Sequence, residues 1–121
     1  MENFRNFTAS DAFGTDWAVE FQWQQNAISI RHADAVDVKF FVTTGGVSME
    51  KVIALPHPHL LKLSAELGRV LSDPWCCKVA AAHLKSMIES SDDIDRTLIT
   101  VNYSEMKAAA IAAEPAAVAT H

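Results

Sequence analysis

The 121-residue chain is poor in cysteine, and this scarcity already limits what holds it together. Its only two cysteines, Cys76 and Cys77, are neighbours. Adjacent residues on a helix point about 100° apart, so the pair cannot easily reach the geometry that a disulfide requires. No disulfide framework is expected, which fits a reducing compartment.

Long hydrophobic runs are also missing. No stretch approaches the ~20 apolar residues that a membrane-spanning helix needs, and the N-terminal sequence MENFRNFTASDAFGTDW has no apolar core behind a basic start, as a secretory signal would. These absences predict a soluble cytoplasmic protein without a membrane partner.

Positive charge is scarce as well. The chain has 10 basic and 15 acidic residues, a formal net charge of −5, and its lysines and arginines are scattered without a run. Because nucleic-acid binding depends largely on neutralising phosphates, this charge argues against nucleic acid as the partner.

The composition is otherwise that of a folded protein. Half of the residues are apolar and 21% are charged, which is typical of globular domains. The length corresponds to one domain by the usual measure of ~100–200 residues per domain. A chain of this size can bury enough surface to fold without a metal or a disulfide.

The stretch WAVEFQWQ, residues 17–24, alternates strictly between apolar and polar side chains. A period of two indicates a half-buried strand, and aromatic residues suit its surface. Four side chains are expected to share its apolar face: Trp17, Val19, Phe21 and Trp23. Gln25-Asn26 then predicts a tight turn, because asparagine tolerates positive φ, and residues 27–32 are predicted to complete a hairpin.

Further strands follow the same alternating pattern. They are expected over residues 36–43, 47–55 and 96–102. The first four strands make an antiparallel meander with one apolar face, although Lys51 interrupts the apolar pattern of the fourth. Such a sheet has to bury this face, and helices are the available cover.

Three helices are expected after the meander. The first covers residues 58–67 and starts on a proline, which is tolerated at that position. The second takes Asp73 as its N-cap and Pro74 as its first residue, and it runs to about Ser90. The third is expected over residues 104–114.

The predicted fold class is therefore α+β, an antiparallel meander sheet of four to five strands with one face covered by two or three helices. The expected organisation is a flexible N-terminal arm over residues 1–15, a single α+β domain over 16–103, and a C-terminal helix with a frayed tail over 104–121. Phe4 and Phe7 in the arm either pack on the flank of the domain or dock on a partner.

Residues 71–84, LSDPWCCKVAAAHL, hold the only patch with soft-ligand chemistry. Cysteine behaves as a small hydrophobic residue, so Cys76 and Cys77 are interpreted first as close-packed core residues. On the same helix His83 lies at the boundary between the apolar and polar faces, where a histidine most often hydrogen-bonds a carbonyl group.

The alternative interpretation is a metal or haem site. Thiolate and imidazole ligands suit Cu(I) or Zn(II). The candidate ligands are Cys76, Cys77, His83, His57 and His59. Adjacent cysteines do not have the spacing of a structural zinc site, however, and Cys76 and His83 are separated by about 10 Å of helical rise. The cofactor is left unknown.

Motifs of catalysis do not stand out in the sequence. It contains neither a glycine-rich phosphate loop nor a Gly-x-Ser-x-Gly elbow. The acidic segment around Asp92, Asp93 and Asp95 lacks the ligand pattern of a calcium loop. The sequence thus favours a protein that is not an enzyme.

The predicted function is that of a small accessory or regulatory protein that acts through protein–protein contact, as a homodimer or on a larger partner. The apolar strand face exceeds what short helices cover, so a partner would bury the rest. The contact surface is expected to include Phe4, Phe7, Trp17 and Trp23.

Two alternatives remain open. One is a sensor that binds a metal or a small ligand through Cys76, Cys77 and His83. The other, a minor one, is a single-stranded nucleic-acid binding domain, because some such domains also consist of four antiparallel strands followed by a helix. The side chains that could then stack on bases are Trp17, Trp23 and Phe41.

Overall fold

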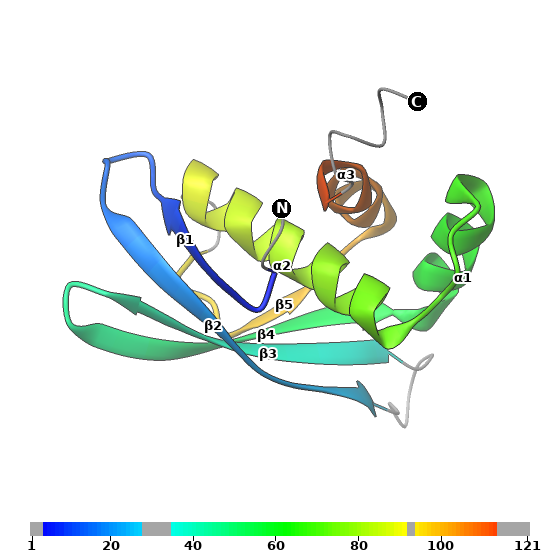
Figure 1. The fold of residues 1–121 in the computed structure, drawn as a ribbon, viewed down its shortest axis with the longest axis horizontal. Coiled ribbons are helices and arrows are strands. Elements are labelled where there is room, and N and C mark those ends of the chain that lie inside the picture. The colour runs from blue at the N-terminus through cyan, green and yellow to red at the C-terminus, as the bar shows by residue number, and fades with distance from the viewer. Residues whose placement is uncertain (1–3, 28–34, 92–93, 114–121) are drawn as a thin grey trace.

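The computed structural model describes residues 4–27, 35–91 and 94–113. Along the chain, the elements are β1 (Asn6–Ser10), β2 (Asp16–Ala27), β3 (Ala35–Thr44), β4 (Val47–Pro56), α1 (His57–Leu67), α2 (Asp73–Ser90), β5 (Leu98–Thr100) and α3 (Tyr103–Ala113). The sheet forms one layer and the helices form a second layer on one of its faces (Figure 1). The predicted α+β class is confirmed.

The strands form one sheet in the order β1-β2-β3-β4-β5. The first four pair antiparallel with their neighbours in the sequence, whereas β5 pairs in parallel with β4. A parallel neighbour requires a crossover connection, and α1 and α2 supply it. The sheet is therefore an antiparallel meander that is extended by one parallel strand.

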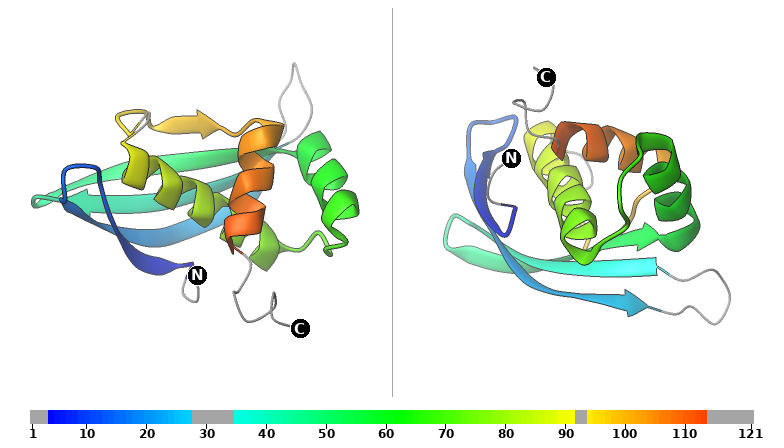
Figure 2. Two further views of the ribbon diagram at one scale, coloured as in Figure 1. Left: turned by 90° about the horizontal axis from the view of Figure 1, so that it is seen from above. Right: turned by 45° about the vertical axis from the view of Figure 1, so that its right-hand side comes forward.

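The core lies between the sheet and the helices. In β3 every second side chain is buried, as the predicted alternation requires: Val36, Val38, Phe40 and Val42. Helix α2 lies against the sheet, and α3 packs on α2 and α1 (Figure 2). None of the helices in the part of the chain described here is long and apolar enough to cross a membrane.

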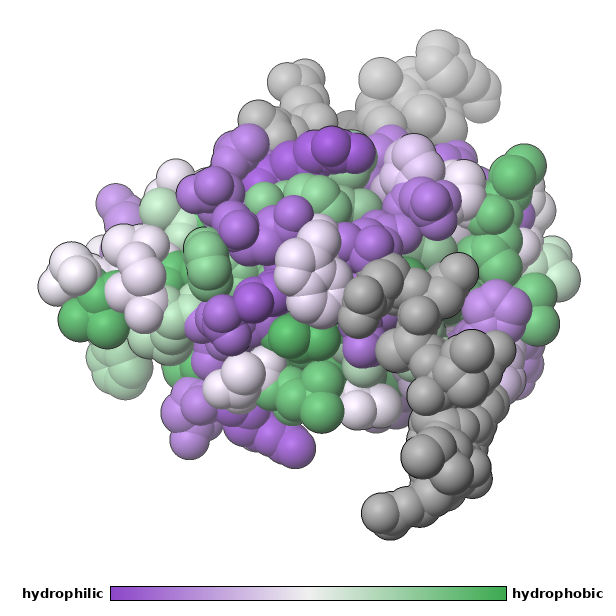
Figure 3. Space-filling view, turned by 90° about the horizontal axis from the view of Figure 1, so that it is seen from below, coloured by the Kyte–Doolittle hydropathy of each residue, from purple (hydrophilic) through white to green (hydrophobic). Residues whose placement is uncertain are grey.

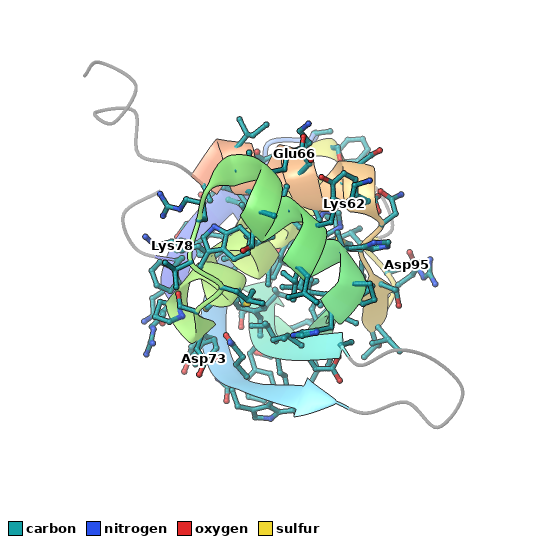
Figure 4. The ribbon with its side chains drawn as sticks, turned by 90° about the vertical axis from the view of Figure 1, so that its right-hand side faces the viewer. Lys62, Glu66, Asp73, Lys78 and Asp95 are labelled. Atoms are coloured by element: carbon teal, nitrogen blue, oxygen red, sulfur yellow. The ribbon has the colours of Figure 1, made fainter. Side chains whose placement is uncertain are left out.

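Helix α3 is an integral part of this core. Its buried residues are Met106, Ala109, Ala110 and Ala113. On the surface, Glu66 of α1 accepts hydrogen bonds from the Tyr103 hydroxyl and from the Lys107 ammonium group, and Lys62 lies 4.3 Å from the centre of the Tyr103 ring (Figure 4). Helix α3 thus packs on the core, although the expected boundary places residues 104–121 outside the domain, and the predicted tail over 114–121 lies outside the described residues.

The helix starts follow the rules for capping but differ in detail from the predictions. Ser72, rather than the predicted Asp73, caps α2, since its side chain accepts a hydrogen bond from an N–H of the first turn. At the start of α3, Asn102 and Glu105 form a reciprocal capping box with bonds of 2.8 and 3.1 Å. Both helices nevertheless begin within one residue of the expected positions.

The expected flexible arm over residues 1–15 contains a strand instead. Residues 6–10 form β1, which pairs with the start of β2 at the edge of the sheet. Phe7 and Ala9 lie opposite core residues of β2, and both pack against the core. A strand of five residues with only two apolar positions is too short to show a clear period, which is why the sequence pattern did not reveal it.

The predicted hairpin of residues 17–24 and 27–32 is also wrong. Strand β2 continues through the expected turn, and Gln25 and Asn26 pair with residues of β3. Residues 28–34 lie outside the described residues. The turn propensity of asparagine is a local preference, and here the pairing with β3 overrides it.

A β-bulge in β2 changes which side chains face the core. Phe21 lies opposite Phe40, but Trp23 lies opposite Lys39, so one extra residue is inserted between them. The insertion turns Trp23 to the outer face of the sheet, where it is 38% exposed, while Trp17 is only 8% exposed. The predicted face is right for the first three apolar residues of the strand and wrong for Trp23.

Lys51 is buried on the helix side of β4 and is only 1% exposed. Its ammonium group donates hydrogen bonds to the backbone carbonyl oxygens of Ile94 and Arg96, in the segment that leads into β5. Burial lowers the pKa of Lys51, and the carboxylate of Asp95 acts in the opposite direction. The residue that interrupts the apolar pattern therefore anchors the last strand to the sheet.

Candidate functional site

Cys76 and Cys77 lie near the start of α2, and both are buried free thiols in the core. Burial raises the pKa of both thiols to about 11. Nucleophilic and metal-binding cysteines react as thiolates, whereas these two groups are protonated at neutral pH. Their environment is that of the close-packed core residues of the first interpretation.

His57 and His59 lie apart from these thiols, at the start of α1. The His59 ring packs edge-on against Tyr103 of α3, with 5.9 Å between the ring centres. Among the described residues, which include all five predicted ligands, no group of three or more His, Cys, Asp or Glu side chains is placed to hold a metal ion. The five predicted ligands are therefore not brought together into one such group.

His83 differs from the other predicted ligands because it lines a cavity. The cavity lies between α2, β5 and α3 and has a volume of about 520 Å³. His83 is 8% exposed, and within the described ranges its ring makes no hydrogen bond. Burial lowers the pKa of His83, and the negative charge of Glu105 opposes this shift. Among residues 4–27, 35–91 and 94–113, the expected hydrogen bond to a carbonyl is not formed.

The predicted contact residues near the N-terminus pack against their own domain. Trp17 is in the core, and its indole N–H donates a 3.0 Å hydrogen bond to Asp11. Phe4 and Phe7 are partly buried against the same core. The ammonium group of Lys78 lies 5.5 Å from the centre of the Phe4 ring. Of the four predicted contact residues, only Trp23 is exposed.

The outer face of the sheet, defined as the face away from the helices, carries the second candidate site. A row of four paired residues crosses it from strand to strand. The row consists of Trp23 in β2, Lys39 in β3, Val52 in β4 and Leu98 in β5. Leu98 is 56% exposed, so apolar side chains are accessible at both ends of the row.

Lys39 lies in the middle of this row and contacts side chains of three strands. Its ammonium group lies 5.7 Å from the ring centre of Trp23 and 5.5 Å from that of Phe41, distances at which a cation is attracted to an aromatic ring. The same group forms a 2.7 Å ion pair with Glu50 of β4. In the space-filling view of this side, small hydrophobic areas alternate with polar ones (Figure 3). The outer face thus combines aromatic, aliphatic and charged groups of both signs.

Sequence reasoning found Trp23 but assigned it to the wrong face, and it missed Lys39 and Leu98 as its neighbours. The signal for Lys39 is its position between the buried residues Val38 and Phe40, which places it on the opposite face of β3. The position of Leu98 depends on the parallel pairing of β5, for which the sequence carries no local signal.

Comparisons of the chain with protein-family models, with curated proteins and with solved structures give no match. The functional argument therefore depends on the two sites themselves, the outer face of the sheet and the cavity beside His83.

Proposed function

We propose that this chain is a small non-catalytic accessory or regulatory protein that acts through protein–protein contact, with the outer face of the sheet as the contact surface and a second copy of the chain as the partner. The observation that carries the proposal is the row from Trp23 to Leu98, which lies across four strands on the face that no described helix covers. Large aromatic residues are enriched in protein interfaces.

The charges on this face support self-association. Lys39 is accompanied by carboxylates on the same face, those of Glu20, Asp37 and Glu50. In a two-fold symmetric contact the same surface meets itself, so Lys39 of one copy can approach a carboxylate of the other. Such opposite charges guide the orientation of two partners.

The single-stranded nucleic-acid alternative has less support. Trp17 is buried, and the carboxylates beside Lys39 would repel phosphates. A cytoplasmic location belongs to the proposal, and the two free thiols favour it because disulfides are rare in reducing compartments.

Light scattering coupled to size-exclusion chromatography tests the proposal, with the protein loaded over a wide range of concentrations. The wild-type chain should elute at twice its mass of 13.2 kDa. Leu98→Glu should shift it toward the mass of one chain, and the double variant Trp23→Thr/Leu98→Glu should complete this shift, because a charge at the interface is left without a partner.

Ile111→Glu is the matched control. Ile111 is on α3 and is 56% exposed, as is Leu98, but it lies on the helix side of the molecule. This variant should keep the wild-type mass. A wild-type protein that remains a monomer at every concentration contradicts the proposal, and so does an equal effect of Leu98→Glu and Ile111→Glu.

A further inference from the structure

The cavity between α2 and α3 is independent of the outer face, because it lies on the helix side of the sheet. Its volume of about 520 Å³ falls in the range of roughly 300–1,000 Å³ that is usual for small-molecule sites. Apolar side chains form part of its wall, and a ligand would pack against Met87, Ile99 and Ala109. All three are buried, so a ligand would meet an apolar surface of the core itself.

His83 gives this wall one buried polar group. The residue is more than nine-tenths buried, it lines the cavity, and no hydrogen bond to its ring is present in residues 4–27, 35–91 and 94–113. Its ring nitrogens are accessible from the cavity, because the side-chain polar atom that is sealed without a partner in the described residues is Nε2 of Gln24. A ligand in the cavity can therefore accept a hydrogen bond from the imidazole N–H in place of water.

The two charged residues of the cavity have opposite signs, and only the positive one attracts an anion. They are Arg96, which precedes β5, and Glu105 in the first turn of α3. The carboxylate of Glu105 already accepts the N–H of Asn102, and it lies at the positive end of the helix dipole, which offsets part of its charge. The guanidinium group of Arg96 has the planar pair of donors that matches a carboxylate.

We propose that this cavity binds a small organic acid, whose carboxylate accepts hydrogen bonds from Arg96 and His83 and whose apolar body lies against Met87 and Ile99. The site uses a residue of the predicted ligand set, but without the thiols and without a metal ion. It adds a binding activity to the proposed contact function and does not depend on the oligomeric state.

Nuclear magnetic resonance of the full chain tests this site, with sodium benzoate as the probe and the ring signals of His83 as the readout. Benzoate should shift these signals until they reach saturation, and it should raise the pKa of His83, because an anion favours the protonated ring. Benzylamine, which has the same phenyl ring but a positively charged aminomethyl group, should cause no saturable shift.

Two variants and a control locate the binding. Arg96→Gln should weaken benzoate binding about tenfold, since a charge-assisted hydrogen bond is lost. Ala108→Leu fills the cavity from α3 and should abolish binding, whereas Ala65→Leu, at an exposed alanine of α1 that does not line the cavity, should bind as the wild type does.

The absence of a saturable shift of His83 by benzoate overturns the proposal. Equal binding of benzylamine overturns the assignment of an acid, and unchanged binding by Arg96→Gln removes the carboxylate contact. If Ala108→Leu fails to fold, the comparison of Arg96→Gln with the wild type still decides the matter, because Arg96 contacts Lys51 only through its backbone carbonyl.

Discussion

Lys51 in β4 donates a hydrogen bond from its ammonium group to the backbone carbonyl oxygen of Ile94, 43 positions further along the chain. The same group also reaches the carbonyl oxygen of Arg96. A buried cation thus satisfies two carbonyl groups of a segment without regular structure, directly before β5.

Replacing this lysine tests the anchor directly. Lys51→Met keeps most of the side-chain volume but leaves both carbonyl groups without their donor, so the free energy of unfolding should fall by about 2 kcal/mol or more. Urea unfolding measures the loss. Lys85→Met on α2 is the control and should stay within about 0.5 kcal/mol of the wild type. Equal stability of Lys51→Met and the wild type would show that the anchor contributes nothing.

Fluorescence quenching tests the placement of Trp23 by the bulge. Trp17 and Trp75 are buried, whereas Trp23 is 38% exposed, so Trp23 should account for most of the quenching by acrylamide. Trp23→Phe should therefore reduce the quenching strongly, while Trp17→Phe should leave it almost unchanged. If the alternation of residues 17–24 were strict, the two variants would behave alike.

Chemical reactivity tests the state of the two cysteines. Their pKa values of about 11, compared with 9.0 for an unperturbed thiol, leave about a hundredfold less thiolate at mildly alkaline pH. Burial slows the reaction further. Labelling with Ellman's reagent should thus be at least a hundredfold slower in the native protein than in urea. A thiol that reacts rapidly in the native state would contradict the core assignment.

The buried imidazole of His83 should make stability depend on pH. The pKa of His83 is lowered in the folded state. At a pH below the ordinary pKa of 6.5, the unfolded chain therefore binds more protons than the folded chain. The free energy of unfolding should consequently decrease as the pH falls from 6.5 toward the pKa of the folded state. Of the charged groups that line the same cavity, Arg96 and Glu105, the carboxylate of Glu105 opposes this lowering of the pKa of His83.

His83→Gln removes this contribution. The loss of stability between neutral pH and about pH 5 should be smaller in the variant than in the wild type, because one buried titrating group is gone. Urea titrations at several pH values measure the difference. An identical pH dependence in both proteins would show that protonation of His83 is not linked to folding.

Much of the fold could be predicted because its signals are local. The alternation in residues 36–43 and 47–55 depends on neighbours in the sequence, and both strands were found within one residue at each end. The sequence Ser72-Asp73-Pro74 likewise fixes the start of α2, and the predicted end at Ser90 agrees with the structure. Period and capping are properties of a single segment.

The features that could not be predicted depend on pairing between distant segments. The bulge before Trp23 exists only relative to β3, and the parallel direction of β5 exists only relative to β4. The cavity beside His83 requires α2, β5 and α3 together. The sequence therefore indicated the residue types of the candidate site, whereas their surroundings are determined by tertiary structure.

The lengths of the strands affect how copies of the protein can meet. The two outermost strands of the described sheet, β1 and β5, have five and three residues, while the three between them have ten or more. A long uncovered margin invites another chain to add its own strand and to propagate into fibres. Within the described residues, however, β1 covers only Asp16–Glu20 of β2 and β5 covers only Val52–Ala54 of β4, so strand addition is disfavoured along those stretches and the second half of β2 is the margin at which another chain can pair.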